Sequence, residues 1–130
     1  MARALATYLC LAALLAGCDD RMQMRASYPD RTAAEQDGAF RRGWLPSWMP
    51  ISARDIEEIH DLDTNVQAIR FTVPLGWRPP TSAACSAAQT IEPPRLRLSS
   101  FPARIEEQPN ILKCGDLCVV VVGETVFAWR

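Results

Sequence analysis

Hydrophobic and polar residues alternate most regularly over residues 66–73. Ile69, Phe71 and Val73 are two residues apart, so they share one face of an extended chain. This alternation predicts a half-buried strand. Pro74 ends it, because proline cannot donate a hydrogen bond to a strand ladder.

A second strand-forming region lies near the C-terminus and predicts a hairpin. Residues 117–122 are apolar on both faces, which is typical of a central strand covered by helices. Gly123 and Glu124 follow, and glycine at the first central position is what a type II′ turn requires. Residues 125–129 then predict the returning strand.

Helices are predicted where capping residues and helical spacing coincide. Residues 29–42 begin with proline, which is favoured in a first turn, and end with arginines that suit the helix dipole. Within residues 52–60, Ile56 and Ile59 are spaced to share one helical face. An alanine-rich helix is expected over residues 82–89. We therefore predict an α+β fold, a single domain in which two or three helices pack on a small antiparallel sheet.

The first residues have the layout of an export signal. Arg3 is followed by an apolar run over residues 4–16, which is shorter than the ~18–20 residues of a membrane-spanning helix. Asp19 and Asp20 come directly after this region and argue against a permanent span. The pattern predicts a secretory signal rather than a transmembrane helix.

The end of this signal, Leu14-Leu15-Ala16-Gly17-Cys18, resembles the lipobox of bacterial lipoproteins. The resemblance implies that residues 1–17 are a lipoprotein signal peptide that is removed, and that Cys18 carries acyl chains such as palmitate. Residues 18–28 would form the lipidated end and its tether, and residues 29–130 a periplasmic domain. An ordinary cleaved signal and a buried N-terminal helix are the alternatives.

Lipidation would place the domain on the periplasmic face of a membrane. Two or three acyl chains anchor a protein stably, whereas a single chain binds only marginally. By resemblance to enteric lipoproteins, Asp19 and Asp20 after Cys18 favour the inner membrane over the outer membrane. The membrane is thus the first predicted partner, reached through Cys18.

Charge gives no sign of a nucleic-acid partner. Without Arg3 the mature chain has 14 − 1 = 13 basic and 15 acidic residues, a net charge of −2. No basic patch or polybasic stretch is present, so neither nucleic acid nor electrostatic lipid binding is predicted.

The segment Trp44–Ile51 has the most unusual composition, with two tryptophans and two prolines. These aromatic side chains either fill the core of a small domain or form an exposed contact for another protein. In the second interpretation Trp44, Trp48 and Met49 are the candidate partner surface.

The chain also resembles a family of small bacterial lipoproteins that has no established activity. The shared residues are Gly43-Trp44-Leu45-Pro46-Ser47-Trp48-Met49-Pro50, Ser52-Ala53, Ile56, Leu62-Asp63-Thr64-Asn65, Phe71 and a hairpin ending in Ala128-Trp129-Arg130. The resemblance implies a lipid anchor and a compact α+β domain, with no catalytic residues to carry over.

Three cysteines remain after the signal and the lipidated residue, in a compartment where disulfides persist. Cys85, Cys114 and Cys118 allow one bridge and one odd thiol, and their spacing leaves the pairing open. The family resemblance implies a bridge between Cys85 and Cys114, with Cys118 as an extra residue.

No metal or catalytic site is predicted. Asp61, Asp63 and Asn65 copy the start of an EF-hand loop, but valine replaces the required glycine, so a side-chain-capped turn is the simpler interpretation. The cysteine pair near residue 114 lacks the two-residue spacing of a redox motif. His60 is interpreted as a helix-end residue.

We therefore expect a non-enzymatic, lipid-anchored periplasmic domain without a cofactor, which contacts an envelope protein. The alternative is a domain that binds a small molecule or a cell-wall fragment, which predicts a concave pocket lined by tryptophan and a few polar groups. An enzyme is the least favoured class.

Overall fold

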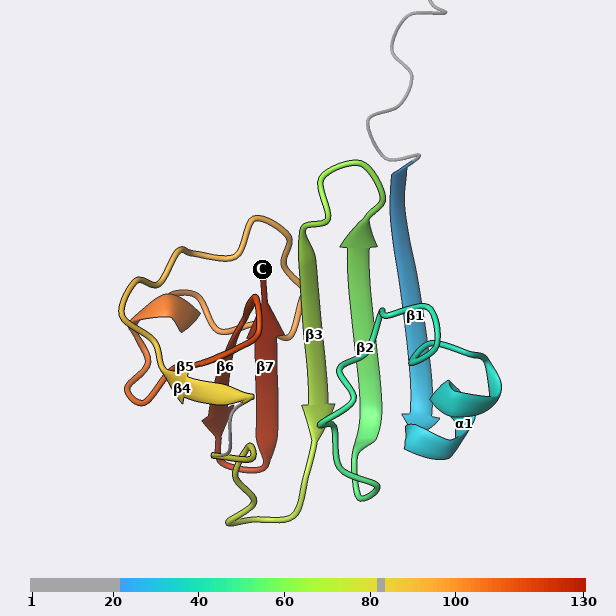
Figure 1. The fold of residues 1–130 in the computed structure, drawn as a ribbon, viewed down its shortest axis with the longest axis horizontal. Coiled ribbons are helices and arrows are strands. Elements are labelled where there is room, and N and C mark those ends of the chain that lie inside the picture. The colour runs from blue at the N-terminus through green and yellow to red at the C-terminus, as the bar shows by residue number, and fades with distance from the viewer. Residues whose placement is uncertain (1–21, 82–83) are drawn as a thin grey trace, which may run out of the picture.

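The computed structural model describes residues 22–81 and 84–130. The predicted signal peptide, Cys18, Asp19 and Asp20 lie outside these residues. The described chain forms one antiparallel sheet of seven strands in the order β1-β2-β3-β7-β6-β5-β4 (Figure 1). The strands are β1 Gln23–Asp30, β2 Arg54–Asp61, β3 Gln67–Thr72, β4 Cys85–Ala87, β5 Leu112–Cys114, β6 Leu117–Val122 and β7 Thr125–Trp129.

Helix is a minor component of this fold. α1 covers only Arg31–Gln36, and the 3₁₀ turn η2 covers Ile105–Glu107. In the described ranges no helix is long and apolar enough to cross a membrane. The predicted α+β class with two or three packed helices is therefore wrong, because the molecule is mainly an antiparallel β-sheet.

The predicted helix over residues 52–60 is strand β2. The spacing of Ile56 and Ile59 fits a helix, but the two side chains point to opposite faces of the sheet. Each is buried in a different apolar cluster, with exposed fractions of 0% and 1%. Two covered faces explain the apolar residues at both even and odd positions.

The predicted helix over residues 29–42 is mostly strand and turn. β1 continues to Asp30, whose carboxylate then caps α1 by accepting a hydrogen bond of 2.8 Å from the Ala33 amide. The helix stops before Gly38, which adopts a φ of +80°. β1 begins at Gln23, within the range 18–28 that was predicted as the tether.

The helix predicted over residues 82–89 is wrong, because this range contains the short edge strand β4. Residues 82–83 lie outside the described ranges. The strands predicted over 66–73, 117–122 and 125–129 are confirmed as β3, β6 and β7. Gly123 adopts a φ of +63° between β6 and β7, as the predicted turn requires.

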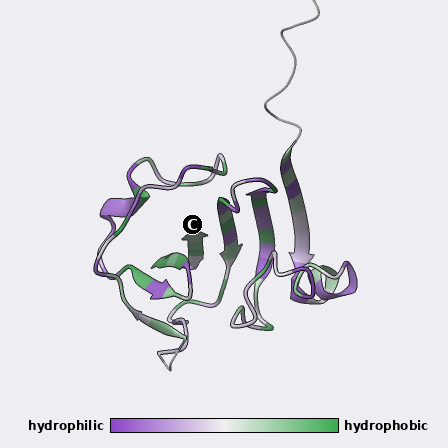
Figure 2. Cartoon of the chain, turned by 45° about the horizontal axis from the view of Figure 1, so that its top comes forward, coloured by the Kyte–Doolittle hydropathy of each residue, from purple (hydrophilic) through white to green (hydrophobic). Residues whose placement is uncertain are grey.

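Two irregular segments cover opposite faces of the sheet. Hydrophobic and hydrophilic residues alternate along β1 and β2 (Figure 2). Residues 34–53 supply Ala34, Leu45 and Met49 to the first cluster, which rests on Ile56, Ile69, Phe71, Val119 and Val126. Residues 98–111 supply Leu98, Phe101 and Ile105 to the second, which rests on Ile59, Val120, Phe127 and Trp129. The sheet is thus the middle layer of the molecule.

Candidate binding site at one end of the sheet

The tryptophan- and proline-rich segment covers the first face of the sheet. Leu45 and Met49 are buried with 3% and 0% exposure, whereas Trp44 and Trp48 are half-buried. The prediction that Met49 belongs to a partner surface is therefore wrong. The segment fills the core with its aliphatic side chains and leaves part of both tryptophans accessible.

The two tryptophans have different neighbours. The Trp48 ring lies 6.3 Å from the Phe71 ring, centroid to centroid, over the middle of the sheet. The Trp44 ring lies 4.4 Å from the His60 ring, and the Arg42 guanidinium lies 4.1 Å from the Trp44 centroid. Such aromatic and cation–π contacts fix the ring positions.

Glu58, His60 and Gln67 form a buried polar network between Trp44 and the sheet. Glu58 accepts a hydrogen bond of 2.8 Å from Gln67 Nε2, and its Oε1 also lies 2.7 Å from His60 Nδ1. Gln67 Nε2 donates as well to the carbonyl of Trp44. His60 therefore belongs to strand β2, with 6% exposure, and its predicted place at a helix end is wrong.

Burial raises the pKa of the Glu58 carboxyl above its ordinary value. Three neighbouring residues act to lower this pKa. Gln67 does so through its hydrogen bond, His60 through its charge and hydrogen bond, and Arg130 through its charge. Glu58 Oε2 and His60 Nε2 are buried and have no hydrogen-bond partner among the described residues. The network is only partly satisfied, so it is sensitive to substitution.

An open hollow of about 360 Å³ lies at the end of the sheet where β3 begins and β7 ends. Trp44 and Trp48 form part of its wall, and Ser47 and Gln67 contribute polar groups. The remaining lining residues are Gly43, Pro46, Ala84, Cys114, Gly115, Asp116, Leu117 and Arg130.

Charged groups close the other side of this hollow. Arg130 Nη1 donates a hydrogen bond of 2.8 Å to Asp116 Oδ2, and the Asp116 side chain is 64% exposed. The amide and carbonyl of Arg130 pair with those of Gln67 at 3.0 Å, which extends the β3–β7 ladder. The hollow therefore combines aromatic surface with an accessible ion pair.

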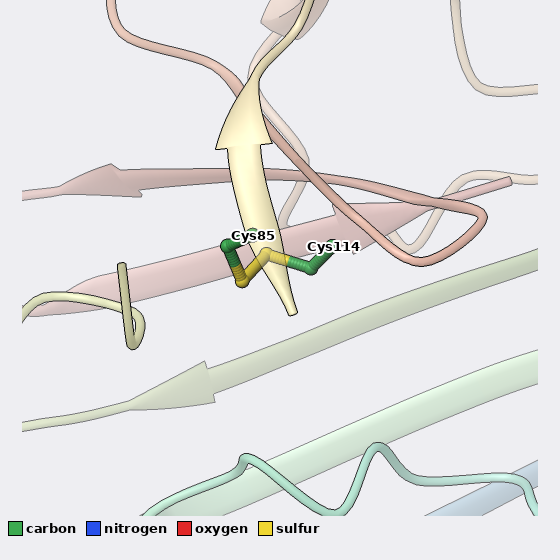
Figure 3. Close-up of a disulfide and its surroundings, with 2 residues drawn as sticks. All are labelled: Cys85 and Cys114. Carbon is green, nitrogen blue, oxygen red and sulfur yellow. A yellow bond between two sulfur atoms is a disulfide. The ribbon is translucent and has the colours of Figure 1, made fainter. Parts of the chain in front are cut away.

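The disulfide at the edge of the hollow joins Cys85 of β4 to Cys114 of β5 (Figure 3). This is the pairing that the family resemblance implies. Cys118 is the free thiol; it is 4% exposed and belongs to the second cluster, on the other face of the sheet. Its side chain points away from the bridge, so the sheet itself selects which two cysteines pair.

The Asp61–Asn65 segment is the turn between β2 and β3. Asp61 Oδ1 accepts hydrogen bonds from the amides of Asp63 and Thr64, both at 2.9 Å, and from the Thr64 hydroxyl at 3.0 Å. These bonds, those from Thr64 first, hold the pKa of the Asp61 carboxyl below its ordinary value. The predicted side-chain-capped turn is confirmed.

Several lining residues were not predicted. Gln67 precedes Ile69 and Phe71 with the same period of two, so a polar residue on an apolar face was the available signal. Asp116 and Arg130 gave no such signal, because only the order of strands in the sheet brings them together.

Comparison with known protein families finds a match to part of the chain. A family model described as the YbbD head domain matches residues 23–72. This range includes β1, α1, the tryptophan-rich segment, β2 and β3. No curated protein and no solved structure matches the chain.

Proposed function

We propose that this protein is a lipid-anchored domain of the bacterial cell envelope, and that it binds a small polar ligand in the hollow beside Trp44 and Trp48. The lipobox-like sequence ending at Cys18 and the similarity of residues 23–72 to the YbbD head domain support an envelope-associated protein. The shape and chemistry of the hollow support binding as its activity.

The observation that carries this proposal is a concave site with two partly accessible tryptophans and an ion pair. Its volume of about 360 Å³ lies within the usual range of small-ligand pockets, roughly 300–1,000 Å³. Tryptophan rings stack on the apolar faces of sugar rings, and the Asp116–Arg130 pair offers both a charge acceptor and a donor. A cell-wall fragment carries these complementary groups.

The test uses a soluble form with Cys18→Ala and disaccharide-peptide fragments that a muramidase releases from peptidoglycan. Binding should change the tryptophan fluorescence with a saturable dependence on fragment concentration. Ser47→Tyr places a ring in the hollow and should weaken binding at least tenfold. Ser100→Tyr changes an exposed serine in the segment that leads to the opposite face and is the matched control.

Equal affinity of the wild-type and Ser47→Tyr forms would refute the hollow as the binding site. Absence of saturable binding by the folded wild-type domain would refute this ligand class. The proposed activity is binding alone. The peptidoglycan fragments recovered after incubation should therefore be chemically unchanged.

The second candidate is an envelope protein partner that contacts the Trp44–Ile51 segment. Ile51 favours it, because this large apolar side chain is 73% exposed. A photo-crosslinker at Ile51 should capture one defined protein in intact envelopes, whereas a crosslinker at the equally exposed Leu75 should not. Capture from both positions alike would contradict a specific contact at this segment.

A further inference from the structure

The start of β1 places one end of the sheet close to the proposed lipid anchor. Only 22 − 18 = 4 residue steps separate Cys18 from Met22. At ~3.3–3.6 Å per residue this stretch spans at most ~14 Å. β1 begins at the end of the sheet where β2 runs into β3, so this end must stay near the lipid headgroups (Figure 1).

Exposed apolar side chains gather at this end. Met22, Met24 and Leu62 are 44%, 43% and 57% exposed. Leu62 N donates a hydrogen bond of 3.0 Å to Met22 O, which extends the β1–β2 pairing one step beyond Gln23 and Asp61. Directly opposite residues and residues two apart share a face of a sheet, so these three side chains form one patch.

The surroundings of the patch suit a neutral interface. Met24 pairs in register with His60, against which the half-buried Trp44 ring lies, and tryptophan favours the headgroup region of a bilayer. Asp61 and Asp63 lie in the adjacent turn, and Arg42 over the Trp44 ring is paired with Asp37, so the described residues give this end no excess of positive charge. Contact with a membrane would therefore depend on apolar side chains rather than on anionic lipid.

We propose that the Met22–Met24–Leu62 patch rests on the bilayer surface and fixes the orientation of the domain on its membrane. This inference rests on the proposed lipid anchor at Cys18. The same end of the sheet carries the hollow beside Trp44, so the binding site opens close to the lipid headgroups.

The experiment uses the full lipidated chain in vesicles of phosphatidylcholine and phosphatidylglycerol. An environment-sensitive dye is attached to Leu62→Cys, and doxyl-labelled lipid serves as the quencher. Leu75→Cys is the matched control, since Leu75 is 77% exposed and follows β3 at the other end of the sheet. The parent chain, whose free Cys118 is buried, controls for labelling elsewhere.

The dye at position 62 should be quenched several-fold more than the dye at position 75, equally at low and high salt. Met24→Ser should reduce the quenching at position 62, whereas Ile51→Ser should leave it unchanged. Both changes are at exposed positions, and circular dichroism checks the fold.

Two failures are distinguishable. If the protein sediments with the vesicles but positions 62 and 75 are quenched alike, the patch does not contact the bilayer and the anchor stands. If the wild-type protein does not sediment with vesicles and its N-terminus carries no lipid, the anchor is refuted and this inference falls with it. An unchanged signal in Met24→Ser would also contradict the patch.

Discussion

At the scale of single residues, the polar groups of the first face hold the irregular covering segment in place. Tyr28 of β1 donates a hydrogen bond of 2.7 Å to Asp37, and Arg42 also pairs with Asp37 at 2.7 Å. The side chain of Gln67 binds the Trp44 carbonyl. A segment with one short helix is therefore fixed by a few specific contacts to the strands beneath it.

The phenol of Tyr28 should lose its proton only at a pH well above the ordinary tyrosine pKa. Burial, followed by the hydrogen bond and the charge of Asp37, raises its pKa to about 12. Asp37→Asn removes the charge, so the pKa should fall toward the ordinary value but stay above it, because burial is the larger cause. Tyr28 is the only tyrosine in residues 18–130, so phenolate absorbance reports it directly. Glu35→Gln, a nearby exposed carboxylate, is the control; an unchanged pKa in Asp37→Asn would contradict the contact.

Glu58 should make the domain less stable as the pH rises. Its pKa is raised in the folded state, so the folded protein favours the protonated carboxyl. The stabilisation is complete below the ordinary carboxyl pKa of ~4.3 and is lost as the pH rises through the higher folded value. Glu58→Gln cannot titrate, so its free energy of unfolding should show less of this decline.

Urea unfolding from about pH 4 to about pH 7 measures the effect. The matched control is Glu57→Gln, which removes the neighbouring carboxylate of β2 from the opposite face of the sheet. Parallel curves for the wild type and Glu58→Gln would show that the buried carboxyl is not the source of the dependence.

At the scale of elements, local patterns predicted some strands and misled about others. β3, β6 and β7 could be predicted because a period of two, or a doubly apolar run with a glycine turn, is a local signal. β2 could not, because both of its faces are buried and Ile56 and Ile59 then mimic helical spacing. The hollow was anticipated only as a tryptophan-lined alternative, since its far wall at Asp116 depends on the strand order.

The bridge between β4 and β5 should be the main stabiliser of that edge. It closes a loop with a sequence separation of 29, for which the chain-entropy relation gives about 3.5 kcal/mol. The double variant Cys85→Ala/Cys114→Ala should lose about this much in a urea titration. A reductant should shift the wild type and Cys118→Ala but not the double variant, and an equal shift in all three would contradict the assignment.

At the scale of the whole molecule, the sheet order makes the two halves of the chain interdependent. The YbbD head match ends at residue 72, yet β3 pairs with β7 along Ala68–Thr72, and β7 comes from the far end of the sequence. Residues 98–111 also cover the second cluster, which includes Ile59 of β2. The matched region therefore lacks both a partner for its edge strand and a cover for one of its faces.

A fragment of residues 23–72 should not fold alone. Isolated, it would leave the β3 edge unpaired and expose Ile59 and Ala68, which are 1% and 0% exposed in the whole domain. We expect narrow amide dispersion in its NMR spectrum, whereas residues 22–130 should give a dispersed one.

A dispersed spectrum of the fragment would show that the three strands fold independently and that residues 73–130 are an addition to them. If the fragment is unfolded, adding a peptide of residues 84–130 with its Cys85–Cys114 bridge formed should restore dispersion, because it supplies β7 and the covering segment together.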